Sequence, residues 1–303
     1  MQKPKIIVIL GQTATGKSDF AVDVAKNING EIISADSRQV YKGMDLGTGK
    51  ITKKEMKGVP HYLLDVVSPR NKTFSVSDFQ KLASKKIDEI VKKGKIPIIC
   101  GGTGFYIDAV INGKIFPEVP PNKNLREELS KKTAPQLFSL LKKLDVARAK
   151  NIDKNNKVRL IRAIEIAKAL GKVPKINKTN SPFHVIKIGL AFPQEELKER
   201  IYIRLIKRIK KGMLREMERL HKEGVSWKKM ESFGLEYRYS AFYLQGKMSK
   251  KEMIEKLFSQ IWHFAKRQNT WFKRDGAIIW INPTQKTDTL NAKKEIYKFL
   301  ERI

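Results

Sequence analysis

The chain has 303 residues, of which 41% are hydrophobic, so it can bury an ordinary core and is not expected to be disordered. Its single cysteine, Cys100, excludes an intramolecular disulfide and any cysteine-rich metal site. No run approaches the ~18 apolar residues of a membrane span, and the N-terminus lacks the pattern of a signal peptide, so we expect a cytoplasmic protein without a membrane partner. We also expect it to be a monomer.

The charge is strongly basic and unevenly distributed. The formal net charge is +31, of which residues 1–115 carry +8 and residues 116–303 carry +23. A polyanionic partner such as a nucleic acid explains this excess, because each Lys or Arg set against a phosphate releases a counterion. A lysine-rich surface without such a partner would explain it equally well, so charge alone does not decide between the two.

Short β-branched runs alternate with segments of helical spacing through the first hundred residues. This alternation predicts an α/β fold with a P-loop-like, doubly wound and mainly parallel sheet that is covered on both faces. The predicted strands are 6–10, 31–35, 62–67 and 96–100, followed much later by 185–192 and 277–281. The predicted helices between the early strands are 16–28 and 76–93.

A polar, lysine-rich stretch interrupts this pattern. Residues 117–184 begin and end with clusters of Pro, Gly, Asn and Ser, and they show helical spacing but no strand pattern. We therefore predict a core in two parts, 1–116 and 185–303, with a helical insertion domain over 117–184. The remaining predicted helices are 124–149 and 156–170 within the insertion, and the long amphipathic 195–222 and 250–274 after it.

Residues 11–18, GQTATGKS, match the phosphate-loop pattern G-x-x-x-x-G-K-[ST] between an apolar run and a helical pattern. Glycine lets the backbone wrap so that its N–H groups face an anion, and the helix N-terminus adds positive charge. Lys17 would reach the terminal phosphate, and the Ser18 hydroxyl could ligate Mg²⁺, the expected cofactor. The predicted diphosphate-binding residues of this loop are Gly11, Gln12, Thr13, Ala14, Thr15, Gly16, Lys17 and Ser18.

A phosphate loop alone does not identify the chemistry, because most proteins that carry one are NTPases or kinases. Such enzymes hold Mg²⁺ with an Asp at the end of an apolar strand, and both Asp36 and Asp65 occupy places of this kind. The loop therefore leaves a small-molecule kinase open as an alternative.

Two further motifs follow predicted strands. SADSRQVYKGMDLGTGK (34–50) follows the second strand, and GGTGFY (101–106) follows the fourth. The strand ends of a doubly wound sheet open onto one crevice, so we predict Asp36 and Thr103 beside the phosphate loop. Taken singly, Asp36 could be only a helix cap, and GGTG only a flexible turn.

With these motifs the chain resembles the bacterial tRNA dimethylallyltransferases, also called tRNA isopentenyltransferases. The resemblance spans nearly the whole chain. The pieces that carry it are GQTATGKS, SADSRQVYKGMDLGTGK, PHYLLDV, GGTGFY, DKNNKVRLIRAIE and AKRQNTWFKR. The DSRQVY and AKRQ-x-TWF pieces are the most specific, because a generic P-loop kinase has no reason to carry either.

The resemblance implies a reaction. A dimethylallyl group would pass from dimethylallyl diphosphate to the exocyclic amine of the adenine just 3′ of the tRNA anticodon. It implies Asp36 as the general base, Thr103 near the leaving oxygen and Lys17 at the diphosphate as the catalytic residues. Arg204 matches a family arginine and is expected to add positive charge at the diphosphate.

The resemblance also implies a surface for the anticodon stem-loop of tRNA. The adenine must leave its stack to react, so part of this surface would hold an extruded base. The implied tRNA-binding residues are Asp36, Ser37, Arg38, Gln39 and Thr103 around that base, and Arg126, Val158, Arg159, Leu160, Ile161, Arg162, Lys266, Arg267 and Gln268 elsewhere.

The sequence departs from the family pattern in places. Gln12 stands where the family usually has proline, and we expect little effect from it. SFGLEYRYS (232–240) stands where the family usually reads close to G-Y-K-E, so no role is assigned to this stretch. Two alternatives remain besides a kinase: an isopentenyltransferase acting on free adenine nucleotide, and a nucleic-acid-binding module with a degenerate phosphate loop.

Overall fold

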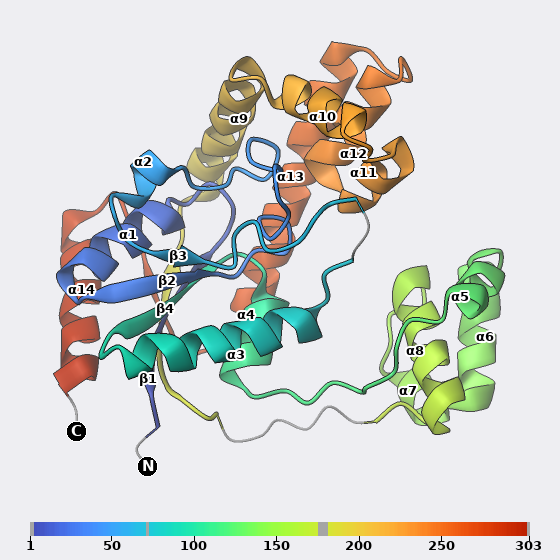
Figure 1. Ribbon diagram of the computed structural model, residues 1–303, viewed down its shortest axis with the longest axis horizontal. Coiled ribbons are helices and arrows are strands. Elements are labelled where there is room, and N and C mark those ends of the chain that lie inside the picture. Colours follow the sequence, from blue (N-terminus) through green and yellow to red (C-terminus); the bar gives the residue numbers. More distant parts are fainter. Residues whose placement is uncertain (1–2, 71–72, 175–180, 302–303) are drawn as a thin grey trace. The chain divides into compact units, whose positions relative to one another are not determined.

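Six parallel strands form one sheet in the order β3-β2-β4-β1-β5-β6. Their bounds are Lys5–Gly11 (β1), Gly30–Ser34 (β2), His61–Tyr62 (β3), Ile96–Gly101 (β4), His184–Leu190 (β5) and Ile278–Ile281 (β6). The two strands predicted after residue 180 do join this sheet, with β5 beside β1 and β6 beside β5. The doubly wound α/β fold expected from the sequence is confirmed, and Figure 1 shows the sheet among its helices.

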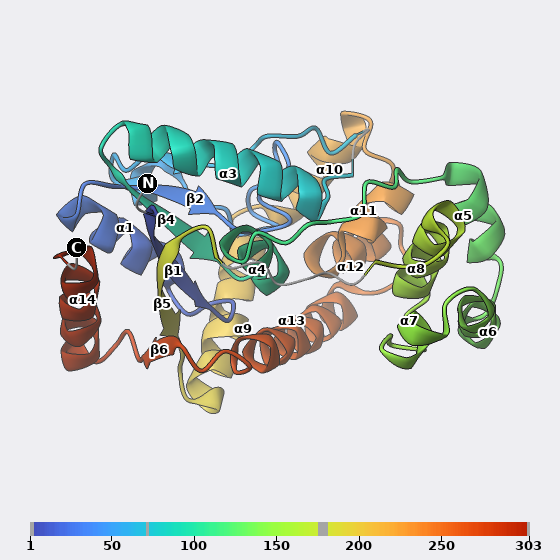
Figure 2. The ribbon, with the colours of Figure 1, turned by 90° about the horizontal axis from the view of Figure 1, so that it is seen from below.

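Both faces of the sheet are buried because successive residues of β1 point to opposite sides. Ile6, Val8 and Leu10 belong to one apolar cluster, and Ile7 and Ile9 belong to another. The first cluster is covered by helices α3 (Val76–Lys92) and α4 (Gly104–Ile111), and the second by α1 (Lys17–Asn27) and α14 (Lys286–Glu301). Figures 1 and 2 show these helices around the sheet.

The third strand is shorter than predicted. We expected a strand over 62–67, but β3 ends at Tyr62, and Leu63 and Asp65 adopt positive φ angles of 62° and 54°. Such backbone cannot continue a strand ladder, and only an isolated bridge between Tyr41 and Val67 follows. The run of apolar residues was therefore misread as a strand where it forms a bent connection.

Glycine and capping residues divide two of the predicted long helices. The predicted helix 195–222 is split at Gly212, whose φ of 103° lies outside the helical range. The predicted helix 124–149 is broken by capping side chains at Thr133 and Asp145. The observed helices are α9 (Gln194–Lys210), α10 (Met213–Lys222), α5 (Lys123–Ser130), α6 (Ala134–Leu144) and α7 (Val146–Lys150).

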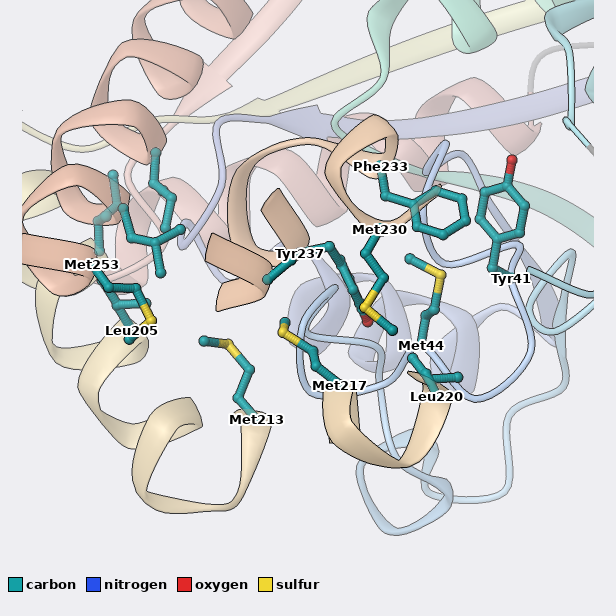
Figure 3. Close-up of a cluster of buried hydrophobic side chains, with 14 of the residues drawn as sticks. Tyr41, Met44, Leu205, Met213, Met217, Leu220, Met230, Phe233, Tyr237 and Met253 are labelled. Atoms are coloured by element: carbon teal, nitrogen blue, oxygen red, sulfur yellow. The ribbon is translucent and has the colours of Figure 1, made fainter. Parts of the chain in front are cut away.

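A methionine-rich apolar cluster joins the helices that follow β5 to the segment after β2. The helices are α9 and α10 together with α11 (Trp227–Phe233), α12 (Leu235–Leu244) and α13 (Lys250–Phe272). Met44 comes from the segment after β2, and Met217, Met230 and Tyr237 come from the helices (Figure 3). The short helix α2 (Lys53–Met56) follows that segment. This cluster fixes the 40–50 segment against α9 and α10, which bounds the site described below.

The structure describes residues 3–70, 73–174 and 181–301, and the chain divides into two compact units. The first unit is Met1–Gly113 with Asn180–Ile303, and the second is Lys114–Thr179. The second unit is helical and holds α5, α6, α7 and α8 (Lys157–Leu170) around its own core, which includes Leu129, Leu141 and Leu160. Our sequence-based bounds for this insertion were 117–184.

No helix in the described part of the chain combines the length and the apolar character that crossing a membrane requires.

Candidate active site

A cavity of about 560 Å³ lies at the carboxyl ends of β1, β2 and β4 in the first unit. Its wall combines the phosphate loop, the turn after β2, the glycine turn after β4 and one face of α9. The sequence-predicted residues that line it are Thr13, Ala14, Gly16, Lys17, Ser18, Asp36, Gln39, Arg204 and Gln268. Asp36 thus shares one cavity with the phosphate loop, as the strand-end argument predicted, whereas Thr103, Ser37 and Arg38 are not among the lining residues.

The phosphate loop is held in its shape from within. Gly16 adopts a left-handed conformation as it opens α1. A Cβ at Gly11 would lie 2.4 Å from the carbonyl oxygen of Leu190, so only glycine allows β5 this close. The buried Thr15 hydroxyl donates to the Gln12 carbonyl at 2.8 Å.

Gln12, expected to matter little, anchors the loop to α13. Its side chain is only 6% exposed, and its amide nitrogen donates to the carbonyl oxygen of Ala265 at 3.1 Å. A proline at this position could not make that bond. The Gln12 side chain therefore contributes a tether that the usual family residue lacks.

Lys17 and Arg204 place two positive charges at this loop without carboxylate partners. Lys17 donates to the Gln12 carbonyl, and Arg204 donates to Thr13 Oγ1 at 3.2 Å and to the Gly49 carbonyl at 3.1 Å. Neither forms an ion pair with any carboxylate in residues 3–70, 73–174 or 181–301. Removing cations from water without counter-ions is costly, so the pair indicates a site built for an anion.

Burial weakens proton binding at both groups. Desolvation lowers the pKa of the Lys17 ammonium to about 8, and the neighbouring Arg204 adds to this effect. Desolvation, together with the charge of Arg208, lowers the pKa of Arg204 to about 10. Lys17 is thus the member of the pair whose charge changes within an accessible pH range.

The affinity for a diphosphate is expected to fall as pH rises through 8. Because Lys17 attracts the anion only in its protonated form, the Kd of a diphosphate ester should be about ten-fold higher at pH 9 than at pH 7. Isothermal titration across this range measures the effect. In Lys17→Arg the guanidinium stays charged, so its curve should be flat. Equal slopes for the two proteins would rule out Lys17 as the titrating group.

Asp36 forms a turn at the end of β2 while keeping one oxygen free. Its Oδ1 accepts the backbone N–H groups of Arg38 at 2.7 Å and Gln39 at 3.3 Å. Its Oδ2 accepts no hydrogen bond from the described residues, and Asp36 lines the cavity. Both views of Asp36 are therefore compatible: it caps a turn with one oxygen and can accept a proton with the other.

Thr103 is tied to the same turn. Its Oγ1 accepts the Ser37 backbone N–H at 3.2 Å, and its own N–H donates to the Ala35 carbonyl at 3.2 Å. The Thr103 hydroxyl donates to no group among the described residues, so its proton is available to a ligand. Ser37, Arg38 and Gln39 are all half-buried here, and the Gln39 amide reaches the Gly49 carbonyl at 3.4 Å.

The glycines of GGTG serve close packing. A Cβ at Gly102 would lie 2.3 Å from the amide nitrogen of Gln268, and one at Gly104 would lie 2.3 Å from the Trp271 ring. Trp271 also donates its indole N–H to Asp108 at 3.2 Å. The motif is thus a packed junction between β4, α4 and α13 and not only a flexible turn.

Gln268 joins the phosphate loop to that junction. It is 6% exposed, accepts the Thr13 N–H at 2.8 Å and donates to the Gly102 carbonyl at 2.9 Å. Both ends of its amide are therefore engaged inside the protein, which gives it a positioning role in the site. Lys266 and Arg267, which precede it in the sequence and were also predicted to bind tRNA, are exposed on α13. The Lys266 ammonium lies 5.1 Å from the centre of the Trp262 ring.

In the second unit, a buried carboxylate orients two of the predicted tRNA-binding arginines. Arg126 donates to both oxygens of Glu165, at 2.9 and 2.8 Å, and Arg162 donates to the same carboxylate and to the Val119 carbonyl at 2.9 Å. Arg126 and Arg162 are partly exposed, so Glu165 orients their guanidinium groups while leaving them accessible from outside. Burial raises the pKa of Glu165, but these hydrogen bonds and one from the Asn122 N–H outweigh it and lower the pKa to about 2.

The α8 residues around Arg162 face different ways. Val158 is 78% exposed, and Arg159 is also exposed, as a surface contact would require. Ile161 is half-buried, and Leu160 is fully buried in the core of the unit. A predicted tRNA contact at Leu160 therefore cannot come from its side chain, because the helical period turns that position inward.

Replacing Glu165 with Ala should destabilise the second unit by about 1–2 kcal/mol, since two partly exposed arginines and the Asn122 N–H lose their shared acceptor. Hydrogen exchange of the α8 amides measures this loss, with the exposed Glu128→Ala on α5 as control. The folded pKa lies below the unfolded value of 4.5, so the stabilisation is present above pH 4.5 and lost as pH falls toward 2. Unchanged exchange in Glu165→Ala would contradict this assignment.

Asp65, the other strand-end aspartate, lies outside the cavity, whereas His61 lines it. The Asp65 carboxylate pairs with Lys50 at 2.6 Å and does not line the cavity, which weakens the kinase alternative at that position. The Nδ1–H group of His61 donates to the Val59 carbonyl at 2.8 Å, and burial lowers the pKa of its imidazole. No role was predicted for His61.

Sequence reasoning missed several residues of the cavity wall. Arg200 and Lys207 line it beside Arg204, and Arg200 donates to the Ala14 carbonyl at 3.1 Å. Their spacing of four and three residues puts all three on one helix face, a signal that could have found them. The apolar wall residues Ile203 and Phe264 carried no comparable signal.

Comparison with known proteins is consistent with this geometry. The profile of the family described as IPP transferase matches residues 39–275. Among curated proteins, the tRNA dimethylallyltransferase 2 of Treponema denticola is 46% identical over 90% of this chain and 92% of its own length. The tRNA dimethylallyltransferase of Anoxybacillus flavithermus is 39% identical over 98% and 96%.

Solved structures agree. The tRNA isopentenylpyrophosphate transferase of Bacillus halodurans superposes with a TM-score of 0.75 at 34% identity, covering 99% of this chain and 97% of that one. A eukaryotic dimethylallyltransferase described as acting on tRNA gives a TM-score of 0.81 at 25% identity, covering 97% and 78%. The chain belongs to the IPP transferase family.

Proposed function

We propose that the protein transfers a dimethylallyl group from dimethylallyl diphosphate to the exocyclic amine of the adenine 3′ of the anticodon in tRNA. The observation that carries this proposal is the composition of one cavity. Two cations without carboxylate partners, Lys17 and Arg204, line the same cavity as Asp36, whose Oδ2 accepts no hydrogen bond from the described residues. An anionic leaving group and a proton acceptor are the two needs of this alkylation.

The chemistry joins these groups in one displacement. The amine nitrogen forms a bond to C1 of the dimethylallyl group while the bond from C1 to the diphosphate oxygen breaks. The amine proton passes to Asp36 Oδ2, and the products are isopentenyladenosine and diphosphate. Lys17, Arg204 and the N–H groups of the phosphate loop hold the charge that develops on the leaving group. Thr103, which lies at the turn beside Asp36 and donates to no described residue, would donate its hydroxyl proton to the bridging oxygen.

The site also suits a magnesium ion. The described residues contain no cluster of three or more His, Cys, Asp or Glu side chains that could cage a metal. Mg²⁺ commonly takes only one or two protein oxygens and completes its shell with substrate phosphates and water. The exposed Ser18 hydroxyl at the cavity wall fits that donor set. When bound, the ion would add positive charge at the leaving diphosphate.

Binding of the RNA would draw on charge and stacking. The adenine must be extruded to reach Asp36, and the half-buried Ser37, Arg38 and Gln39 lie at that turn. Arg126, Arg159 and Arg162 of the second unit are exposed or partly exposed cations suited to phosphates. Such contacts predict affinity that falls steeply with salt.

The test is transfer of labelled dimethylallyl from its diphosphate to an unmodified anticodon stem-loop, with free AMP as a competing acceptor. Label on the adenine next to the anticodon is the expected result. Label on AMP but not RNA would favour a free-nucleotide isopentenyltransferase. If no transfer occurs and the protein hydrolyses ATP, the result would favour the alternative of a P-loop small-molecule kinase.

A further inference from the structure

The segment of the sequence to which no role was assigned, 232–240, lies against the active-site wall. It forms the end of α11 and the start of α12, and its Tyr237 is 2% exposed within the methionine-rich cluster. Figure 3 shows Tyr237 among Met44, Met217 and Met230 of that cluster. A tyrosine buried this deeply needs a partner for its hydroxyl.

That partner is the buried carboxylate of Glu216 on α10. Tyr237 donates to Glu216 Oε1 at 2.8 Å, and Glu216 is 8% exposed. The same carboxylate accepts three consecutive backbone N–H groups, from Asp45 at 2.9 Å, Leu46 at 2.6 Å and Gly47 at 3.0 Å. Glu216 thus holds the backbone of the loop 45–49, and Tyr237 supplies the fourth donor.

The Tyr237 ring also fixes where this loop can run. A Cβ at Gly47 would lie 2.5 Å from the Tyr237 ring carbon that bears the hydroxyl. The loop backbone therefore packs directly on the ring, and glycine is required there. The neighbouring Glu236 completes the contact indirectly, since it pairs with Arg208 at 2.7 Å and Arg208 donates to the Gly47 carbonyl at 3.1 Å.

The 45–49 loop contacts residues on two sides of the cavity, the diphosphate side and the side of the Asp36 turn. Thr48 and Gly49 line it, and the Gly49 carbonyl accepts Arg204 at 3.1 Å and Gln39 at 3.4 Å. Arg204 belongs to the diphosphate side, and Gln39 lies at the turn that Asp36 forms. A displacement of Gly49 would therefore move Arg204 relative to the phosphate loop.

We propose that Tyr237 is a positioning residue for the diphosphate donor, acting through Glu216 and the 45–49 loop on Arg204. The inference rests on the proposed function for the identity of the donor. It gives the divergent 232–240 segment a role at the reaction site without direct contact with substrate. Removing only the hydroxyl should loosen the loop while leaving the ring against Gly47.

The experiment compares Tyr237→Phe with Tyr239→Phe in the full-length protein. Tyr239 is on the same helix, only partly buried, and makes no hydrogen bond through its hydroxyl within the described residues. Three quantities are measured: amide exchange at residues 45–47, the Kd of inorganic pyrophosphate, and the KM values for donor and RNA at a temperature well below unfolding.

Tyr237→Phe should speed exchange at 45–47 about ten-fold and raise the donor KM and pyrophosphate Kd about five-fold, because a hydrogen bond to a charged group is lost. The KM for RNA and all values for Tyr239→Phe should stay near wild type. Unchanged exchange at 45–47, or equal acceleration throughout the first unit, would overturn the inference. Exchange and pyrophosphate binding need no transfer, so a wild-type protein inactive on RNA would refute the proposed function separately.

Discussion

Asp36→Asn is expected to lower kcat for dimethylallyl transfer by ~10²–10⁴ while the affinities for donor and RNA stay close to wild type. The substitution keeps a carbonyl oxygen that can accept the N–H groups of Arg38 and Gln39, so the turn after β2 survives. It replaces the free oxygen with an amide nitrogen that cannot accept a proton. Single-turnover transfer with saturating donor and RNA isolates this step.

Two further variants make the result decisive. Asp36→Ala removes the turn as well as the base, so it should lose RNA affinity in addition to kcat. Asp65→Asn changes the other strand-end aspartate, which pairs with Lys50 outside the cavity, and should cost at most a few-fold. If Asp36→Asn retained kcat within a few-fold and only Asp36→Ala lost it, the residue would be a turn cap and the base would lie elsewhere.

The parts of the site that the sequence predicted are those set by local backbone chemistry. The phosphate loop combines glycines, a following helix and a lysine within eight positions, so its conformation and its ligand class follow from neighbouring residues. The placement of Asp36 beside it follows from the rule that adjacent strand ends share a crevice. Both predictions depend on periodicity and on turn-forming residues, which can be recognised within a short stretch of sequence.

The parts that were missed depend on contacts between distant positions. Glu216 holds a loop about 170 residues before it in the chain, and nothing near Glu216 distinguishes it from the other acidic residues of an amphipathic helix. Tyr237 was passed over because it departs from the family pattern. Both gain their roles only when the methionine-rich cluster brings α10 and α12 to the 45–49 loop.

Gln268 shows how neighbours in the sequence can have different surroundings in space. The family resemblance implied tRNA contacts for Gln268 together with Lys266 and Arg267, the two exposed cations that precede it on α13. Helical geometry turns it away from Lys266 and Arg267 and into the protein, where its amide joins Thr13 to Gly102. A buried glutamine in an apolar stripe was the available signal, and its long-range partners gave that signal its meaning.

Lys17→Met should weaken diphosphate binding and yet make the protein more stable. The kcat/KM for the donor is expected to fall by ~10²–10³, since the charge facing the leaving group is lost. The free energy of unfolding should rise by roughly 1–3 kcal/mol, because an apolar side chain replaces a desolvated cation. Donor kinetics and denaturant unfolding, with the exposed Lys26→Met of α1 as control, measure both effects.

The pH dependence of that gain identifies its cause. The folded pKa of Lys17 is about 8 against 10.5 for the free side chain, so the penalty for burying its charge is complete below pH 8. As pH rises from 8 toward 10.5, the folded state releases its proton before the unfolded state does, and the penalty disappears. The stability of Lys17→Met should therefore exceed that of wild type at pH 7 and approach it at pH 9.5. If the stability difference between Lys17→Met and wild type does not change with pH, the gain comes from packing. If Lys17→Met is less stable than wild type at pH 7, the hydrogen bond from Lys17 to the Gln12 carbonyl outweighs the desolvation of Lys17. If the stability difference between Lys17→Met and wild type narrows from pH 7 to pH 9.5, the free protein holds a buried charge at Lys17 that only a bound diphosphate compensates.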